Sequence, residues 1–355
     1  MKRILLLGEY SGFFSNLKEG FEKIGYEVVL YHDGDGGKKI GGNHEIIDLK
    51  PKSIINNFRY LHNLSEKLAG FDAVFFINPN LLGPYYSLYF FKLIRKKNRK
   101  VYVSSCGDST YLLKAVQKGK FRYYMFNEDL NGSYRKIRTV YERPFMKYLM
   151  HYIDWYVFSN VNSIIPTSYE YAFPLEEFDN VTKGIGLPIV VPDDCPNIEI
   201  KEKILIYYGK NKPFFKGASY IEPALQRLQN EYPDELEVII NERIPYEIYQ
   251  KVIDDADIII DQCKSYGWGM NALIAMAKGK VVASGCEPET LDYFGLTECP
   301  IINIIPDQEQ IYQSLKKVVL NRDELKIRKR LSYEFVKRNN DALRIAYEYS
   351  RLFEE

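Results

Sequence analysis

Three lysines follow an apolar run in the second half of the chain, and their spacing could hold phosphate. Positions 208–217 read Tyr-Gly-Lys-Asn-Lys-Pro-Phe-Phe-Lys-Gly, which places Lys210, Lys212 and Lys216 between a predicted strand and a predicted helix. Ammonium groups beside the free N–H groups of a helix start attract anions, so this stretch predicts a diphosphate pocket. A solvated basic loop would have the same composition, and the sequence leaves both interpretations open.

A second group of polar residues lies between 257 and 289, around another predicted helix start. Residues 257–260 predict a strand that ends in two polar side chains. A glycine turn leads into a helix predicted over 270–277, whose N-terminus favours anions. The next predicted strand, 280–284, ends close to two carboxylates. Together these elements contribute the candidate binding residues Asp261, Gln262, Tyr266, Gly267, Gly269, Met270, Asn271, Glu287 and Glu289.

These groups need a scaffold in which strand ends meet, and the hydrophobic pattern predicts one. Apolar runs at 4–7, 26–31, 73–77 and 101–104 alternate with helical stretches, and a second such series starts at 203. This alternation is typical of a parallel sheet covered by helices on both faces. We therefore expect an α/β fold with two Rossmann-like, doubly wound domains. Ligands of such sheets bind beyond the carboxyl ends of the strands, here in a cleft between the domains.

Prolines indicate where the domains divide. Residues 186–200 contain three prolines and no helical period, which is typical of an interdomain linker. The predicted organisation is an N-terminal domain, a linker, a C-terminal domain and a last helix that packs back toward the N-terminal domain, over 1–187, 188–202, 203–335 and 336–355. A glycine-rich stretch over 32–45 lacks a phosphate-loop pattern and is expected to be a mobile surface loop.

Charge is balanced in total but not along the chain. The 355 residues carry 48 Lys plus Arg and 47 Asp plus Glu, a formal net charge of +1. Residues 51–150 hold 18 basic and 6 acidic residues, whereas residues 151–300 hold 12 and 24. The basic block favours an anionic partner, although charged helix faces could fall this way without one. No nucleic-acid recognition motif accompanies it, so we expect no nucleic-acid partner.

Cysteine usage and hydropathy favour a cytoplasmic protein. The five cysteines are widely spaced without a paired motif, which argues against a disulfide framework or a zinc site. Only four apolar residues separate Met-Lys-Arg from Gly8, too few for the apolar core of a signal peptide. No stretch reaches the roughly 18 apolar residues that a membrane span requires. The four histidines show no metal-ligand spacing.

The combination of these motifs resembles the family 4-like glycosyltransferases of the GT-B fold, which move a sugar from a nucleotide-sugar with retention. The matching parts, spread over almost the whole chain, are the glycine turn at 8–12, the loop ending in Lys216-Gly217, and the stretches 267–269, 275–282 and 287–289. The resemblance implies an acceptor side on the N-terminal domain and a donor side on the C-terminal domain. It also implies that no metal or other cofactor is needed, since basic residues and a helix dipole hold the diphosphate.

The resemblance assigns roles to individual residues. Lys216 would bind the donor diphosphate and act in catalysis, and Lys210 lies near the place of a family arginine, with Lys212 as its rival. Gly12 would belong to the donor-binding turn of the first domain. Asp108 would orient the acceptor hydroxyl, with a helix N-cap as the alternative role. The implied mechanism is front-face displacement, in which an oxygen of the leaving diphosphate helps to remove the acceptor proton.

The sequence departs from the family at two glutamates that flank the glycine turn. Tyr266 and Ile274 stand at the matching positions, so other side chains must contact the ribose hydroxyls and the transferred sugar. Alternatively, the chain is a catalytically silent subunit that binds a nucleotide-sugar or a partner transferase. A sugar-nucleotide epimerase, which shares the fold and acts on the donor itself, is a third hypothesis. The candidates for the missing hydroxyl contacts are Asn271, Asp261, Gln262 and Glu289.

We favour an active, hexosyltransferase-like enzyme that extends a surface polysaccharide or a lipid-linked glycan. Its partners would then be a nucleotide-sugar and a glycan acceptor. In the acceptor domain, the basic segment 92–100 follows an aromatic run at 85–91. Each basic residue near an anionic lipid surface contributes about 1 kcal/mol of binding free energy. We therefore expect peripheral binding of this segment to the inner face of the cell membrane.

Overall fold

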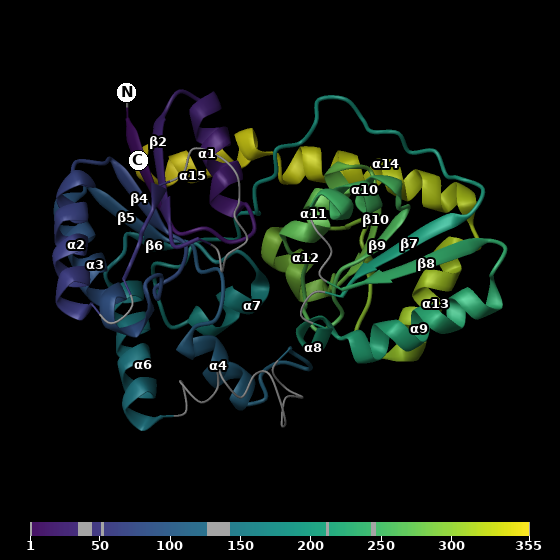
Figure 1. Cartoon of the computed structure of the whole chain (residues 1–355), viewed down its shortest axis with the longest axis horizontal. Helices are drawn as coiled ribbons and strands as arrows, with labels where there is room; N and C mark the ends of the chain where they lie inside the picture. Colours follow the sequence, from purple (N-terminus) through teal and green to yellow (C-terminus); the bar gives the residue numbers. More distant parts are fainter. Residues whose placement is uncertain are drawn as a thin grey trace. The chain divides into compact units, whose positions relative to one another are not determined.

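The computed structural model describes residues 2–34, 45–50, 53–125, 143–210, 213–242 and 246–354 (Figure 1). These residues form two compact units, each of which is described by itself. Of the described residues, unit 1 comprises 2–120, 143–190 and 342–354, and unit 2 comprises 121–125 and 191–341. Lys212 and positions 35–44 of the glycine-rich stretch lie outside the described residues.

Unit 1 contains a parallel sheet in the order β3-β2-β1-β4-β5-β6. The apolar run 4–7 of its central strand is completely buried, because helices cover both faces of the sheet. The strands are β1 (Arg3–Leu7), β2 (Glu27–His32), β3 (Glu45–Ile46), β4 (Ala73–Phe76), β5 (Lys100–Val103) and β6 (Ser163–Ile164). The helices are α1 (Phe13–Lys23), α2 (Ile54–Lys67), α3 (Gly83–Lys97), α4 (Thr110–Gln117), α6 (Pro144–Ser159), α7 (Tyr169–Ala172), η2 (Phe173–Leu175) and α15 (Ala342–Glu354).

Aromatic side chains fill much of the core of unit 1. Phe75 of β4 stacks on Tyr102 of β5 with ring centroids 4.9 Å apart, and Tyr349 of α15 meets Phe75 edge-on at 5.3 Å. The last helix can approach this core because Gly20 of α1 has no side chain. A Cβ there would lie 2.1 Å from the carbonyl oxygen of Ala342. Some of the 30 tyrosines of the chain, Tyr102 and Tyr349 among them, therefore serve the core.

Unit 2 contains a second parallel sheet in the order β11-β10-β9-β7-β8. Its strands are β7 (Ile204–Gly209), β8 (Leu236–Asn241), β9 (Ile258–Ile260), β10 (Val281–Ser284) and β11 (Ile302–Asn303). Its helices are α8 (Pro213–Lys216), α9 (Ala218–Glu231), α10 (Tyr246–Asp255), α11 (Met270–Ala277), α12 (Pro288–Phe294), α13 (Gln308–Val319) and α14 (Arg322–Asn339). The predicted α/β class with two doubly wound parallel sheets is confirmed.

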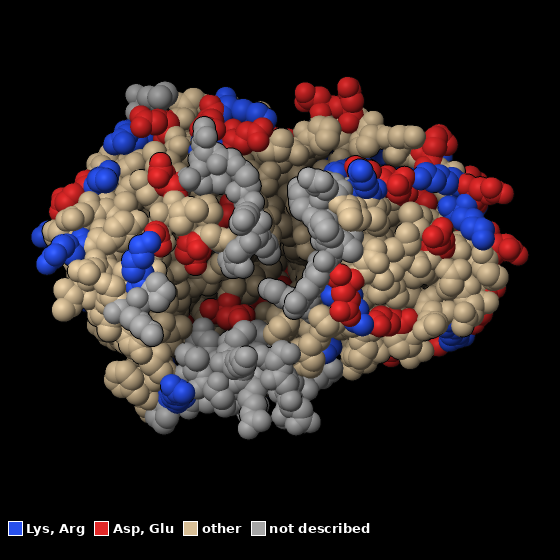
Figure 2. All heavy atoms as spheres, in the orientation of Figure 1, with Lys and Arg blue, Asp and Glu red and all other residues tan. Residues whose placement is uncertain are grey.

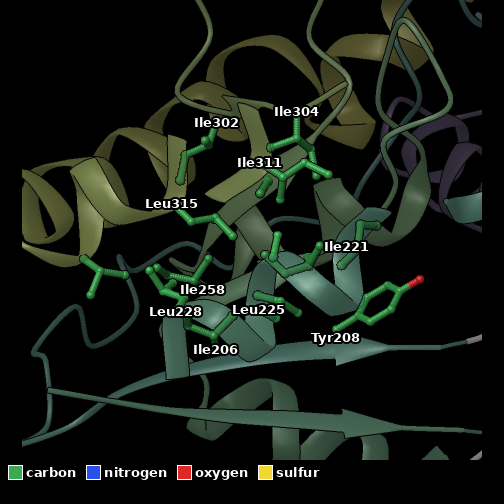
Figure 3. Close-up of a cluster of buried hydrophobic side chains, with 14 of the residues drawn as sticks. Ile206, Tyr208, Ile221, Leu225, Leu228, Ile258, Ile302, Ile304, Ile311 and Leu315 are labelled. Atoms are coloured by element: carbon green, nitrogen blue, oxygen red, sulfur yellow. The ribbon is translucent and has the colours of Figure 1, made fainter. Parts of the chain in front are cut away.

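One face of the second sheet packs on α9 and α13. Ile204, Ile206 and Tyr208 alternate along β7 and point to the same side, as the period of two in a strand requires. Figure 3 shows Ile206 and Tyr208 of β7 in one buried cluster with Ile221 of α9 and Leu315 of α13. All members of the buried cluster on this face are hydrophobic. The cluster therefore anchors the strands, and the candidate site lies at their carboxyl ends.

A buried ion pair fastens α14 to the start of β9. Lys329 Nζ donates to Asp257 Oδ1 at 2.8 Å, and both side chains are almost completely buried, 2% and 3% exposed. Asp257 Oδ2 also accepts the backbone N–H of Leu205 at 3.0 Å. Nearby, Lys280 Nζ donates to the carbonyl oxygen of Asp254 at 2.7 Å. Burial lowers the pKa of Lys280 to about 8, and repulsion from Lys329 adds to the shift.

Because of Lys280, the free energy of unfolding of unit 2 should change with pH in the alkaline range. In the unfolded chain the pKa of Lys280 returns to about 10.4. Between pH 8 and 10 the unfolded state therefore binds more protons, and the free energy of unfolding gains a contribution that rises with pH. Urea denaturation at pH 7.5, 9 and 10 should show this gain in the wild type and lose it in Lys280→Met. Identical pH profiles of the two proteins would contradict the shift.

None of the described helices combines the length and apolar character needed to cross a membrane.

Candidate functional site

The loops after β7 and β9 meet where the strand order of unit 2 reverses. These two strands are neighbours in the sheet, and ligands of doubly wound sheets bind at such switch points. Lys216 Nζ donates to Asp261 Oδ1 at 2.7 Å, with the two side chains 17% and 5% exposed. The structure thus brings together two residues that the sequence placed in separate clusters. It also holds the lysine charge at a fixed point on the carboxyl edge.

Gly217 allows the loop after β9 to approach the backbone beside Lys216 closely. Its φ of +85° is unfavourable for other residues, and a Cβ there would lie 2.3 Å from Cys263 Sγ. The N–H of Cys263 donates to the carbonyl oxygen of Lys216 at 3.1 Å. This bond ties the end of α8 to the loop after β9. Gly217 is the N-cap of α9, so the N-terminus of this helix directly follows Lys216.

The other lysines of the predicted diphosphate pocket are arranged differently. Lys210 Nζ lies 3.0 Å from Glu222 Oε1 and 3.1 Å from Glu242 Oε1. Hydrogen bonds to Glu222 and Glu242 raise the pKa of Lys210. Its charge is therefore shared between two carboxylates, and its role toward phosphate remains a prediction. Lys212, the predicted rival of Lys210, falls outside the described residues.

The predicted helix start at Met270 is present, and the polar side chain of Asn271 beside it is exposed. Gly269 is the N-cap of α11, and space around its Cβ position is free. Gln262 Nε2 donates to the carbonyl oxygen of Gly267 at 3.3 Å, so this amide is used within the loop. The side chain of Asn271, in the first turn of α11, is exposed and has no hydrogen-bond or ion-pair partner among the described residues. Ile274, one turn further, is half-buried.

Tyr266, at a position where the resemblance implied a glutamate, is buried under a segment that the sequence analysis missed. Residues 121–125 pack on it within unit 2. The N–H of Arg122 donates to the Tyr266 hydroxyl at 2.8 Å, and its guanidinium lies 4.8 Å from the ring centroid. Phe121 meets the same ring edge-on at 5.7 Å. Only 3% of Tyr266 is exposed, and burial raises the pKa of its phenol.

Arg122 also pairs with both carboxylates of the loop after β10. It forms ion pairs with Glu287 and Glu289, and its second contact to Glu289, from Nη2 to Oε2, is 3.2 Å long. The hydrogen bond from Arg122 lowers the pKa of Glu289. Glu287 Oε1 additionally accepts from Asn303 Nδ2 at 2.6 Å. These two glutamates therefore share one arginine, and the group keeps one net negative charge. No local pattern of the sequence had indicated this pairing.

The loop of Glu287 lies against the loop of Tyr266 through Gly285. A Cβ at Gly285 would lie 1.9 Å from the carbonyl oxygen of Ser265, and backbone atoms cannot move aside cheaply. The N–H of Glu287 donates to the carbonyl oxygen of Tyr266 at 2.8 Å. This glycine is thus required for the two loops to meet.

We expect Gly285→Ala to destabilise unit 2 by about 3 kcal/mol, the upper part of the range for inserted methyl groups in packed sites. The matched control is Gly269→Ala, because its Cβ would meet open space. Urea denaturation of both variants measures the difference. Equal midpoints for the two substitutions would contradict the close contact.

Polar side chains also gather at the switch point of unit 1, between β1 and β4. Gly107, in the loop after β5, has its Cβ position 3.2 Å from Asn78 Nδ2 and 3.6 Å from Tyr10. Three strand ends therefore meet here. Gly12, with φ +87°, is the N-cap of α1. Its predicted contact with the donor remains a prediction.

Asp108 is half-buried in this group, and its proposed alternative role is wrong. The N-cap of α4 is Ser109, whose Oγ accepts the N–H of Leu112 at 3.2 Å, because Ser109 has the extended backbone of a cap. Asp108 is the residue before the cap. Its role in orienting the acceptor hydroxyl stays a prediction.

Glu9 and Asp154 are buried acids of unit 1 that the sequence analysis did not single out. Glu9 follows β1, is completely buried and accepts from the N–H and Oγ of Ser15 at 2.8 and 2.6 Å. Its Oε1 has no hydrogen-bond partner among the described residues. Asp154 of α6 accepts from Thr110 and Asn80, and burial raises its pKa to about 6. A glutamate two residues after a buried strand was the available signal for Glu9.

The described residues contain no group of three or more His, Cys, Asp or Glu side chains that could hold a metal ion.

Comparisons with known proteins identify the fold. No family model matches the sequence, and no curated protein matches it. Among solved structures, sucrose-phosphate synthase from Thermosynechococcus elongatus matches with a TM-score of 0.63 and 13% identity, over 100% of this chain and 98% of that chain. HepE from Anabaena, in complex with UDP and glucose, matches with a TM-score of 0.62 and 10% identity, over 100% of both chains. The fold is GT-B.

GT-B proteins of another activity match as well. UDP-GlcNAc 2-epimerase from Neisseria meningitidis, bound to UDP-GlcNAc, has a TM-score of 0.50 and 11% identity, over 99% of both chains. At such identities the likeness concerns the fold. The activity has to be argued from the site.

Proposed function

We propose that the protein is a glycosyltransferase that moves a hexose, with retention, from a nucleotide-sugar to a surface-polysaccharide or lipid-linked glycan acceptor. The observation that carries the proposal is the Lys216–Asp261 pair at the switch point of unit 2, beside the start of α9. A partly exposed ammonium group and free N–H groups of a helix start offer positive charge to a diphosphate. The proposal agrees with the two GT-B neighbours of highest TM-score named above, one of which was solved with UDP and glucose.

The chemistry follows from this placement. The bond between the anomeric carbon and the diphosphate oxygen breaks, and the acceptor hydroxyl forms the new bond on the same face of the sugar. The proton of that hydroxyl passes to an oxygen of the leaving diphosphate. Lys216 stabilises the charge that develops on the diphosphate, an effect of about 2–4 kcal/mol in the transition state. No metal is part of this proposal, so a chelator should leave turnover unchanged.

Asn271 is our candidate for the hydroxyl contact that the missing family glutamates would have made. Of the four candidates, Asp261, Gln262 and Glu289 are engaged in the bonds described above, whereas Asn271 is exposed beside the start of α11. An amide can both donate to and accept from a ribose hydroxyl.

We expect Asn271→Ala to raise the donor KM by about three- to tenfold, since a neutral hydrogen bond contributes roughly 0.5–1.5 kcal/mol. The matched control is Asn230→Ala on α9, another exposed asparagine of unit 2. Steady-state kinetics with the donor identified below measure the change. A donor KM equal to that of the control would remove Asn271 from the site.

A panel of nucleotide-sugars tests the proposal itself. The purified protein is incubated with each donor, with and without a glycan acceptor, and thermal shift and products are recorded. Transfer to the acceptor, or slow donor hydrolysis, supports a transferase. Stabilisation without any turnover indicates the catalytically silent subunit, and a new nucleotide-sugar formed without acceptor indicates the epimerase.

A further inference from the structure

Four large aromatic side chains lie exposed along one face of α6 in unit 1. Phe145, Tyr148, Tyr152 and Trp155 are 73%, 75%, 46% and 46% exposed. Their spacing of three, four and three residues places them on the same side of the helix. The ten-residue step from Phe145 to Trp155 gives this aromatic row a length of roughly 15 Å along the helix. Single exposed rings are ordinary, but a continuous row of four indicates an interaction site.

Basic side chains border this row. Helix α3 lies beside α6, since Lys92 Nζ is 4.6 Å from the ring centroid of Tyr156 and Arg95 Nε donates to the carbonyl oxygen of Asn160 at 3.1 Å. Lys96 of α3 and Lys147 of α6 are exposed on the same pair of helices. We call the exposed side of α3 and α6 the α3–α6 face.

The α3–α6 face carries no exposed carboxylate among its described residues. Helix α3 contains no Asp or Glu, and the one acid of α6, Asp154, is completely buried against Thr110. In Figure 2, the corner where Figure 1 places α6 shows tan and blue spheres. Rings and positive charge are therefore the two chemical features that this face offers to a partner.

We propose that the α3–α6 face docks the protein on the surface of an anionic lipid bilayer. Tyrosine and tryptophan rings favour the boundary between headgroups and acyl chains, where the ring is buried and the polar tip stays wet. Lysine and arginine beside them attract anionic headgroups. Both features occur here on two adjacent helices of one unit. The proposal is independent of the proposed function, because docking requires no nucleotide-sugar.

The type of the cations favours a bilayer over a protein partner. Lysine is depleted at protein–protein interfaces, yet it provides three of the basic groups of this face, Lys92, Lys96 and Lys147. A single-stranded nucleic acid would need a basic groove that follows its backbone. The row of rings instead stands on the outward side of a helix.

The structure also changes which basic residues are expected to bind lipid. The sequence pointed to the whole segment 92–100. Lys97 instead forms an ion pair with Glu66, and Lys100 is half-buried at the start of β5. Of this segment, Lys92, Arg95 and Lys96 belong to the α3–α6 face, and Arg99 is exposed just after α3. The aromatic row of α6 joins them.

Vesicle flotation tests the proposal with the full chain. The probes are vesicles of phosphatidylcholine alone and vesicles of phosphatidylcholine with about one third phosphatidylglycerol, an anionic lipid. The wild type should float with the anionic vesicles only. The quadruple variant Phe145→Ser, Tyr148→Ser, Tyr152→Ser and Trp155→Ser should not float. The control Ile327→Ser with Leu331→Ser, two exposed apolar residues of α14, should float like the wild type.

A second pair of variants tests the charge. Lys96→Gln with Lys147→Gln should weaken binding to anionic vesicles about 30-fold, at about fivefold per lysine. The matched control is Lys251→Gln with Lys317→Gln, two exposed lysines of unit 2. Equal loss in both double variants would mean that net charge, not this face, attracts the vesicles, and would overturn the proposal.

Tryptophan fluorescence gives a readout at the face itself. The chain has two tryptophans, and Trp268 is buried in unit 2 whereas Trp155 belongs to the row. Anionic vesicles should shift the emission of Trp268→Phe to the blue, and brominated lipid should quench it. Trp155→Phe should bind the vesicles without either signal. Binding without a change at Trp155, or tight binding to RNA or to a protein with no binding to vesicles, would overturn the proposal.

Discussion

Lys216→Met is expected to lower kcat/KM about 30- to 900-fold while the protein still binds its acceptor. The substitution keeps the apolar stem of the side chain and removes the ammonium group that lies 2.7 Å from Asp261 Oδ1. Removing one charge that stabilises a leaving group costs about 2–4 kcal/mol of transition-state stabilisation, which corresponds to this loss. Steady-state kinetics with the donor found in the nucleotide-sugar panel measure it.

A structural effect has to be separated from this catalytic one. Without Lys216, Asp261 would be a carboxylate with 5% exposure that has lost the cation paired with it, which destabilises the fold. The double variant Lys216→Met with Asp261→Asn removes that orphan charge. Its stability should return toward the wild type, whereas its activity should stay low. Recovery of activity together with stability would show that Lys216 only supports the fold.

A matched lysine provides the control. Lys278 Nζ pairs with Asp254 Oδ1 at the same distance of 2.7 Å, but it follows α11 at the edge opposite the switch point. Lys278→Met should keep wild-type turnover. If both lysine variants lost activity equally, the position of Lys216 would have no special meaning. Full turnover in Lys216→Met would reject its assignment to the leaving diphosphate.

Strands and helices could be predicted from the sequence because parallel, buried strands are encoded by local apolar runs. The run 257–260 became β9, and the helix predicted over 270–277 is α11 with the same bounds. The end of the chain illustrates the limit of such reasoning. A helix was expected from 336, but α14 continues to Asn339 and the helix of unit 1 begins at Ala342. One continuous helical pattern conceals a break between two helices.

The candidate site was less predictable, because its partners are distant in the chain. The sequence named Glu287 and Glu289 as candidate ligands but contained no sign that Arg122, over 160 residues away, would pair with both. Residue types at strand ends indicate which elements form a site. Which charge neutralises which depends on tertiary packing, as Lys210 between Glu222 and Glu242 also shows.

Lys329→Met is expected to destabilise unit 2 by about 3–5 kcal/mol, the cost of leaving a buried charge without its partner. Asp257, at 3% exposure, would then lose its ion pair and keep the hydrogen bond from the N–H of Leu205. The melting temperature of unit 2 should fall by roughly 10 °C. The emission of Trp268 in a Trp155→Phe background reports on this unit.

The same helix offers the control for this prediction, one turn earlier. Lys326 pairs with Glu199 at 2.6 Å, but both side chains are exposed, 45% and 69%. Surface pairs contribute about 0–1 kcal/mol, so Lys326→Met should change the melting temperature little. Lys329→Met with Asp257→Asn should recover part of the loss, because an amide still accepts the N–H of Leu205 without a charge. An equal effect of Lys326→Met and Lys329→Met would show that burial does not decide the strength of this pair.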